Sequence, residues 1–171
     1  MVGAPSCLSG RPGGRAVKEE TMGEDRNLFV VGVDGSENSR RAVEYAAGLA
    51  KRAGASLLLV HVVSWSAYTP LSVEEALHRP VEKKEEERIG REKVLDPLKR
   101  VAEEAGAGDV EVETFLTWGH PAAEIVQIAK DREAEMIIVA RRGHSVLLDI
   151  VLGSVANAVA HMADRPVMLV P

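Results

Sequence analysis

Five short apolar runs, separated by longer segments with helical periodicity, constrain the fold of this chain more than any other feature. Short continuous apolar runs are typical of strands that are buried on both faces, as in parallel sheets. Strands that alternate with helices predict an α/β fold, with helices on both faces of the sheet and right-handed crossovers. The runs lie at residues 28–33, 56–63, 110–116, 136–140 and 166–170, and the third alternates apolar with polar residues, which predicts a strand near the edge.

The segments between these runs have the apolar spacing of amphipathic helices. The first has Ser36 or Asn38 as its N-cap and Gly54 as its C-terminal stop, because these residue types satisfy helix ends. The longest segment, 83–105, starts with a charged run typical of a solvated face. Pro97 either kinks this helix, as we expect, or is the first residue of a second helix that Asp96 caps. Two shorter helices are expected at residues 122–130 and 153–162.

Composition excludes several classes of protein. The chain has 171 residues, a net charge of -5 and 4% aromatic residues, which disfavours a nucleic-acid binder. A single cysteine, Cys7, cannot form an internal disulfide. No run reaches the ~20 apolar residues of a membrane span, and no signal peptide is evident, so we expect a cytoplasmic protein. Residues 1–26 are expected to be a disordered or loosely packed tail, followed by one folded domain, 27–171.

Polar loops follow the predicted strands. The carboxyl ends of parallel strands lie on the same side of a sheet. Open α/β sheets bind ligands just beyond these ends, where the winding of the sheet reverses. The loops supply a carboxylate, glycine-rich turns and two arginines, which suits a nucleotide better than an apolar ligand. They are Asp34-Gly35-Ser36, Val62-Val63-Ser64, Trp118-Gly119-His120 and Arg141-Arg142-Gly143.

The loop after the fourth run has the features of an anion site. Gly143, Gly153 and Ser154 place several backbone N–H groups around the start of a helix. The first N–H groups of a helix lack partners and carry partial positive charge, so they attract anions. The same residues also fit an ordinary turn, in which glycine closes the loop and serine caps the helix. The spacing alone leaves both interpretations open.

Several motifs occur in a recognisable order along the chain. They are Val-Asp-Gly-Ser-Glu-Asn-Ser at 33–39, Leu-Leu-Val-His-Val at 58–62, Gly-His-Pro-Ala at 119–122, Arg-Arg-Gly at 141–143, Gly-Ser-Val at 153–155 and Pro-Val-Met-Leu-Val at 166–170. Together they resemble the universal stress protein family over residues 27–171. The resemblance implies a single-domain, five-stranded parallel sheet in the order 3-2-1-4-5, and a homodimer paired through the C-terminal strand, 166–171.

One branch of that family binds ATP through a Gly, two residues, Gly, nine residues, Gly-Ser/Thr pattern. Carried over by position, the resemblance implies that Asp34 binds ribose or adenine and that the backbone of Val33 and Val62 contacts adenine. Mg²⁺ or Mn²⁺ would be bound through the phosphates. The residues implied to surround the ribose and phosphates are Ala140, Arg142, Gly143, Gly153, Ser154 and Val155.

Ala140 departs from the pattern, because it stands where the first glycine is expected. A glycine there serves either a positive φ or a close approach of the backbone to the ligand. With a positive φ, alanine costs on the order of 1 kcal/mol. With a close approach, the methyl group displaces the ribose, so in both cases we expect weakened rather than abolished binding. The nine-residue spacer also lacks the Lys or Arg that family members often carry there. Arg141 and Arg142 either supply the missing positive charge for the phosphates or are simply exposed to solvent.

The motifs predict an ATP-binding stress-response protein that acts as a dimer, rather than a dedicated enzyme. The chain has no Walker-type Gly-Lys-Ser/Thr loop and no carboxylate pair spaced for two metals, so we expect slow hydrolysis at most, with His120 or His144 as the candidate base. The alternative is a family member that has lost ATP and acts as a protein-interaction module. A third possibility, an adenine-nucleotide synthetase or ATP pyrophosphatase, is disfavoured. Such enzymes need a Ser-Gly-Gly or His-x-Gly-His motif after the first strand, where this chain has Asp34-Gly35-Ser36.

Overall fold

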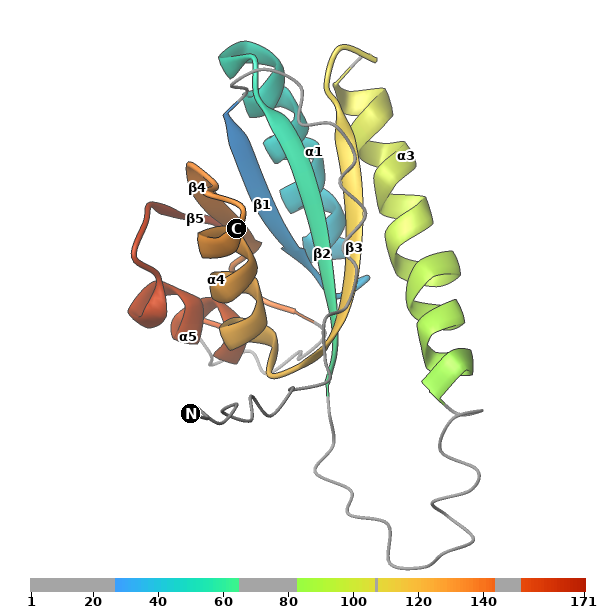
Figure 1. The fold of residues 1–171 in the computed structure, drawn as a ribbon. Coiled ribbons are helices and arrows are strands. Elements are labelled where there is room, and N and C mark those ends of the chain that lie inside the picture. Colours follow the sequence, from blue (N-terminus) through green and yellow to red (C-terminus); the bar gives the residue numbers. More distant parts are fainter. Residues whose placement is uncertain (1–26, 65–82, 107, 144–151) are drawn as a thin grey trace, which may run out of the picture.

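A parallel sheet of five strands forms the centre of the molecule (Figure 1). The computed structural model describes residues 27–64, 83–106, 108–143 and 152–171, and the predicted tail lies outside them. The strand order is β3-β2-β1-β4-β5 and all neighbours are parallel, which confirms the predicted fold and its order. The strands are β1 (Leu28–Val33), β2 (Ser56–Ser64), β3 (Val112–Gly119), β4 (Met136–Ala140) and β5 (Val167–Val170).

Helices cover both faces of the sheet, as the alternation of elements predicts. Helices α1 (Glu37–Ala53) and α3 (Asp96–Ala105) pack on one face, and α4 (Pro121–Asp131) and α5 (Ser154–Met162) pack on the other (Figure 1). None of the helices among the described residues is long and apolar enough to cross a lipid bilayer.

Each face of the sheet has its own core, because successive residues of a strand point to opposite faces. In β1, Val31 belongs to the core under α1 and Val30 to the core under α4. Ala42, Ala46 and Ala50 of α1 are fully buried, and their small side chains let this helix lie close to the sheet. Close-packed cores of this kind hold the strand ends, and the loops that leave them, in fixed positions.

The ends of α1 show why this helix begins directly after β1. Ser36 is the N-cap, and its Oγ accepts a hydrogen bond from the Ser39 N–H at 3.1 Å. Gly54 ends the helix with φ 63°, a left-handed conformation that glycine adopts without strain. Of the two predicted caps, Ser36 is therefore the one that is used.

The long helix continues through Pro97, but its middle is π-helical. Residues 83–89 are α-helical, Gly90–Leu95 form the π-helix η1, and α3 follows without a side-chain cap. A proline lacks its N–H and crowds the carbonyl group four residues earlier. In the turn before Pro97, the N–H of Asp96 donates to the fifth carbonyl back, that of Arg91. The irregularity expected at Pro97 is thus a wider turn directly before it.

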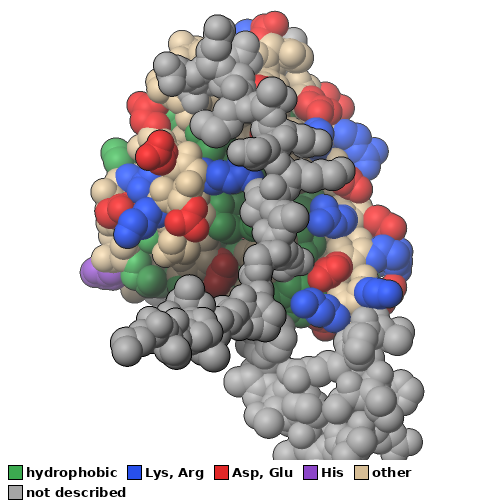
Figure 2. Space-filling model, in the orientation of Figure 1, with side chains coloured by type: hydrophobic (Ala, Val, Ile, Leu, Met, Phe, Trp, Pro, Cys, Tyr) green, Lys and Arg blue, Asp and Glu red, His purple; other side chains and the backbone are tan. Residues whose placement is uncertain are grey.

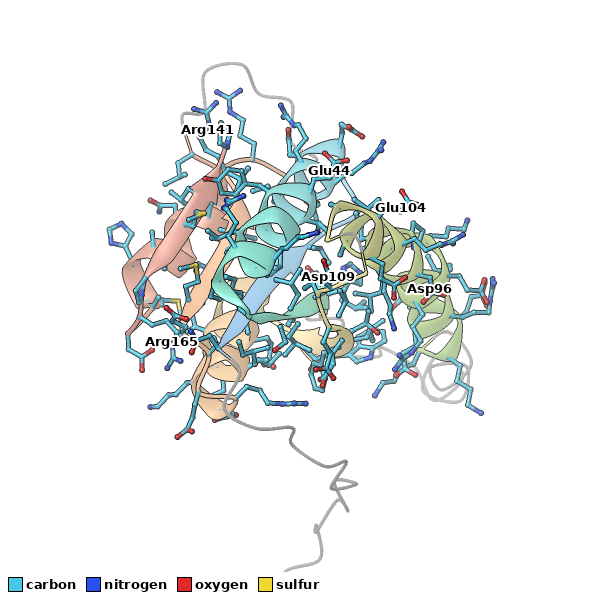
Figure 3. The ribbon with its side chains drawn as sticks, turned by 90° about the horizontal axis from the view of Figure 1, so that it is seen from above. Glu44, Asp96, Glu104, Asp109, Arg141 and Arg165 are labelled. Atoms are coloured by element: carbon cyan, nitrogen blue, oxygen red, sulfur yellow. The ribbon has the colours of Figure 1, made fainter. Side chains whose placement is uncertain are left out.

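Charged side chains of both signs cover the outer surface of this helix (Figure 2). Arg88 pairs with Glu85 and Glu92, which lie one turn away on either side. The hydrogen bond from Arg88 lowers the pKa of Glu85. These groups are exposed, so the pairs add little stability. Asp96 and Glu104 also point away from the sheet (Figure 3), and the charged run is a solvated face, as predicted.

The bounds of β3 differ from those expected. The strand begins at Val112 and continues to Gly119, so it includes Trp118 and Gly119, which were expected to lie in a turn. Its predicted edge position is correct, because β3 pairs only with β2 within the described sheet. The neighbouring strand β2 extends to Ser64 and pairs with both Trp118 and Gly119, so these residues are part of the sheet.

Candidate functional site

A cavity of about 450 Å³ opens at the carboxyl ends of β1, β2 and β4, beside the starts of α4 and α5. It lies where the winding of the sheet reverses, between β1 and β4, which is the position at which open α/β sheets bind ligands. The structure brings all nine residues implied by the family resemblance together around this cavity. They are Val33, Asp34, Val62, Ala140, Arg142, Gly143, Gly153, Ser154 and Val155.

The cavity also has lining residues that the sequence did not single out as site residues. Most of them adjoin a predicted site residue in the chain, so their proximity could have been expected. Pro121 and Ile125 are different, because they come from α4, which was predicted only as a packing helix. A Cβ atom on Gly32 would lie 2.6 Å from the Ile125 Cδ1, so this glycine lets α4 approach β1. The additional residues are Gly32, Ser39, His61, Val63, Ser64, Pro121, Ile125, Val139 and Ala156.

Asp34 is held in one orientation by the start of α1. Its Oδ1 accepts hydrogen bonds from the Ser36 N–H at 3.0 Å, the Ser36 hydroxyl at 2.6 Å and the Ser39 hydroxyl at 2.5 Å. Ser36 and Ser39 are only 7% and 2% exposed, so both hydroxyls need an acceptor within the protein. The other carboxylate oxygen, Oδ2, lies next to Gly143. The carboxylate therefore places negative charge at a defined point of the cavity wall.

The loop after β4 passes so close to its neighbours that two of its glycines have little or no room for a side chain. A Cβ atom on Gly143 would lie 2.4 Å from the Asp34 Oδ2, and one on Gly153 would lie 3.2 Å from the Arg141 carbonyl oxygen. The Gly153 N–H donates to that carbonyl at 2.9 Å, and the Arg141 N–H donates to the Val170 carbonyl at 2.7 Å. Packing alone therefore accounts for glycine at position 143, whereas a side chain at position 153 would require its neighbours to shift by a few tenths of an ångström.

The start of α5 presents backbone N–H groups to the cavity. Its N-cap, Gly153, has no side chain to accept from them, and the first turn contains no acidic residue. The Asn157 N–H donates to the Gly153 carbonyl, so the N–H groups of Ser154, Val155 and Ala156 precede the first bond within the helix. All three of these residues line the cavity. This wall of the cavity is suited to an anion, because the start of a helix carries partial positive charge.

Two arginines precede Gly143 and have buried nitrogen atoms. Within the part of the chain that the structure describes, the Nε atoms of Arg141 and Arg142 are buried and have no hydrogen-bond partner. Arg142 lines the cavity, whereas Arg141 lies at the end of β4, beside β5 (Figure 3). A buried donor without an acceptor is costly. An anion in the cavity would supply the acceptor that Arg142 lacks.

The backbone at Ala140 does not require glycine. Glu133 is the one non-glycine residue with a positive φ among the residues described, whereas Ala140 is extended in β4 and pairs with Val170. The Ala140 side chain packs against the core on the α1 side of the sheet. Of the two reasons for a glycine at this position, strain at a positive φ does not apply.

The candidate histidines occupy different environments. The Nδ1 of His61 lies 2.9 Å from the Val33 carbonyl oxygen, so this ring is hydrogen-bonded within the sheet. His120 is exposed and makes no capping hydrogen bond to α4, and His144 lies outside the described residues. No group of three or more His, Cys, Asp or Glu residues that could hold a metal ion occurs in the described ranges. The site is built from backbone amides, a carboxylate and a guanidinium group.

Comparisons with known proteins agree with this architecture. The sequence model of the universal stress protein family matches residues 27–171. Universal stress protein YxiE of Bacillus subtilis (strain 168) is 34% identical over 148 residues, which cover 84% of this chain and 98% of that protein. Universal stress protein UspA from Lactobacillus plantarum has a similar structure, with a TM-score of 0.70 and 21% identity over 86% of this chain and 100% of that one. A universal stress protein solved in complex with cAMP is 27% identical, with a TM-score of 0.57 and coverage of 85% and 96%. The match over residues 27–171 and the identity to the Bacillus protein show that this chain belongs to the universal stress protein family.

Proposed function

We propose that this chain is a stress-response protein that binds an adenine nucleotide, ATP in particular, and acts as a dimer in the cytoplasm. The observation that carries the proposal is the convergence of three groups on one cavity. These are the fixed carboxylate of Asp34, the uncapped start of α5 and the guanidinium group of Arg142, whose Nε is buried without a partner. The related protein in complex with cAMP supports an adenine nucleotide as the class of ligand.

The position of each residue supports a specific role. Asp34 would accept hydrogen bonds from ribose hydroxyls, and the backbone at Val33 and Val62, at the ends of the two strands, would contact adenine. The phosphates would lie against the loop after β4 and the start of α5. When bound, the nucleotide itself supplies the oxygen ligands for Mg²⁺ or Mn²⁺. The residues proposed to hold the phosphates are Arg142, Gly143, Gly153, Ser154 and Val155.

Binding, rather than dedicated hydrolysis, is the function that these residues support. The Asp34 Oδ1 already accepts three hydrogen bonds, and the His61 Nδ1 is engaged with the Val33 carbonyl group. A general base must reach the proton that it abstracts, and His120, the candidate base within the described residues, is not among those that line the cavity. We therefore expect slow ATP hydrolysis at most.

The experiment that tests this function is mass spectrometry of the nucleotide released from the purified protein, followed by calorimetric titration with ATP and Mg²⁺. We expect an adenine nucleotide in the released fraction and saturable binding of ATP. GTP serves as the matched comparison, because it keeps the phosphates and changes the base. Absence of binding at millimolar ATP would contradict the proposal and would favour the alternative, a protein-interaction module that has lost the nucleotide.

Replacing Ala140 with glycine should change the affinity for ATP by less than about 3-fold, because its φ is not positive and its methyl group packs toward α1. The added flexibility should lower the free energy of unfolding by roughly 0.5–1 kcal/mol. Parallel calorimetric titrations of the variant and the wild type measure the first effect. If the variant binds ATP about tenfold more tightly, the methyl group obstructs the ligand.

The open edge of β5 supports the proposed homodimer through residues 166–171. The carbonyl groups of Pro166 and Val170 accept from β4, so the alternate residues 167 and 169 turn their backbone groups toward the open edge of the described sheet. Unpaired edges of this kind can pair with a second strand. The apolar side chains of residues 167–169 in β5 are partly exposed, and Met162 at the end of α5 is 51% exposed.

The variant Met162→Lys should raise the dimer dissociation constant by about tenfold or more, because it places a charge beside the proposed interface. The matched control is Phe115→Lys, since Phe115 is also exposed, at 36%, but lies on β3 at the opposite edge of the described sheet. Sedimentation velocity over a range of concentrations measures both constants. A wild-type protein that sediments as a monomer would contradict the proposed dimer, and equal effects of the two variants would contradict this interface.

A further inference from the structure

We propose that Asn38 is a positioning residue for residues 141–143, which directly follow β4, and that it raises the affinity for phosphate-bearing ligands from outside the cavity. This inference rests on the proposed nucleotide-binding function. Asn38 lies in the first turn of α1 and is not one of the residues that line the cavity. Its Nδ2 donates to the carbonyl oxygen of Gly143 at 3.4 Å, across a separation of 105 positions in the sequence. The contact therefore joins the first turn of α1 to Gly143, at the start of the loop that follows β4.

Arg41 determines which end of the Asn38 amide faces Gly143. The Nη2 of Arg41 donates to the Asn38 Oδ1 from the next turn of α1. The amide oxygen accepts and the amide nitrogen donates, so engaging the oxygen with Arg41 directs the NH₂ group to the Gly143 carbonyl. The helix-capping role does not explain Asn38, because Ser36 already caps α1.

The start of the loop, residues 141–143, is thereby held from two sides, by the segment 34–38 and by Gly153. The Asp34 carboxylate lies against Gly143, Asn38 binds the Gly143 carbonyl group, and Gly153 donates to the Arg141 carbonyl at 2.9 Å. A segment that is already held in place loses less conformational entropy when it binds a ligand. Asn38 should therefore strengthen binding of a ligand with phosphates, and adenosine, which has none, should gain little from it.

The variant Asn38→Ala tests this difference with two ligands. We expect the affinity for ATP to fall about 5-fold and the affinity for adenosine to change less than about 2-fold, because a neutral hydrogen bond of this length contributes modestly. Asn38→Asp replaces the donor by a negative charge and should lower the affinity for ATP by about 20-fold. Calorimetric titration measures both ligands, and thermal unfolding verifies that each variant is folded. Unchanged ATP binding by Asn38→Ala, or equal losses for ATP and adenosine, would overturn the inference.

Arg41→Gln separates orientation of the amide from simple charge attraction. Alone, it should lower the affinity for ATP about 3-fold, and it should have no further effect in the Asn38→Ala background. Arg40→Gln is the matched control, because it removes the same charge from a neighbour that pairs with Glu44, and it should leave the affinity within about 2-fold. A loss from Arg41→Gln that persists without Asn38 would overturn the role given to Arg41. A wild-type protein that binds no ATP would instead contradict the proposed function, so the two failures are distinguishable.

Discussion

Replacing Gly143 with alanine should lower the affinity for ATP by about 100-fold, which corresponds to about 2.7 kcal/mol. The added Cβ atom would lie 2.4 Å from the Asp34 Oδ2, a separation at which one of the two groups has to move. The carboxylate cannot turn away at low cost, because its Oδ1 accepts three hydrogen bonds from Ser36 and Ser39. Either Asp34 or the loop after β4 is displaced, and both are proposed to hold the nucleotide. Calorimetric titration with ATP measures the loss.

A matched control for this variant is Gly48→Ala in α1. The nearest atom to a Cβ at Gly48 is the Arg52 Nη1 at 3.6 Å, which is an ordinary contact. This control should leave the affinity for ATP within about 2-fold and raise the helix stability by roughly 0.5–1 kcal/mol. Gly143 is not among the described glycines with a positive φ, so its substitution reports the contact and not backbone strain. Wild-type affinity in Gly143→Ala would contradict the close contact with Asp34.

Local patterns in the sequence were sufficient for the sheet and for the ends of α1. Apolar runs marked the strands, and Ser36 or Asn38 and Gly54 marked the helix ends, because these choices depend on neighbours in the chain. The strand order and the site residues came from the family motifs, and the structure places all of those residues around one cavity. Their roles as ligand contacts remain predictions that the titrations test.

Features that depend on distant contacts could not be predicted in this way. Trp118 and Gly119 stay in β3 because β2 runs beside them, and the Pro97 irregularity is resolved by a π-helical turn rather than by a cap. Ser39 was expected only as part of a helix start, yet its buried hydroxyl holds Asp34. The bond from Asn38 to Gly143 joins positions that no local pattern connects. These features depend on packing or on contacts with other parts of the fold, which local sequence patterns do not encode.

Removing the side chain in Asp34→Ala should lower the free energy of unfolding by about 2–4 kcal/mol, because three donors lose their acceptor. Two of them are hydroxyls of the buried residues Ser36 and Ser39, which water reaches poorly. Asp34→Asn keeps an acceptor oxygen and loses the charge, so we expect a smaller loss of about 1 kcal/mol. Urea denaturation measures both variants. If Asp34→Ala is as stable as the wild type, the carboxylate does not support the start of α1.

A double-mutant cycle between Asp34→Ala and Gly143→Ala then separates the packing role of Asp34 from its proposed ligand role. Without the carboxylate, the methyl group at position 143 loses the neighbour at 2.4 Å, so the stability lost in the single variant, roughly 1–3 kcal/mol, should be recovered. The affinity for ATP should not recover, because Asp34 is itself proposed to bind the ribose. Recovery of stability without recovery of affinity would show that the two roles are distinct. If the double variant does not recover stability, the methyl group contacts some part of the protein other than Asp34. If it recovers affinity for ATP, the contact proposed between Asp34 and the nucleotide is contradicted.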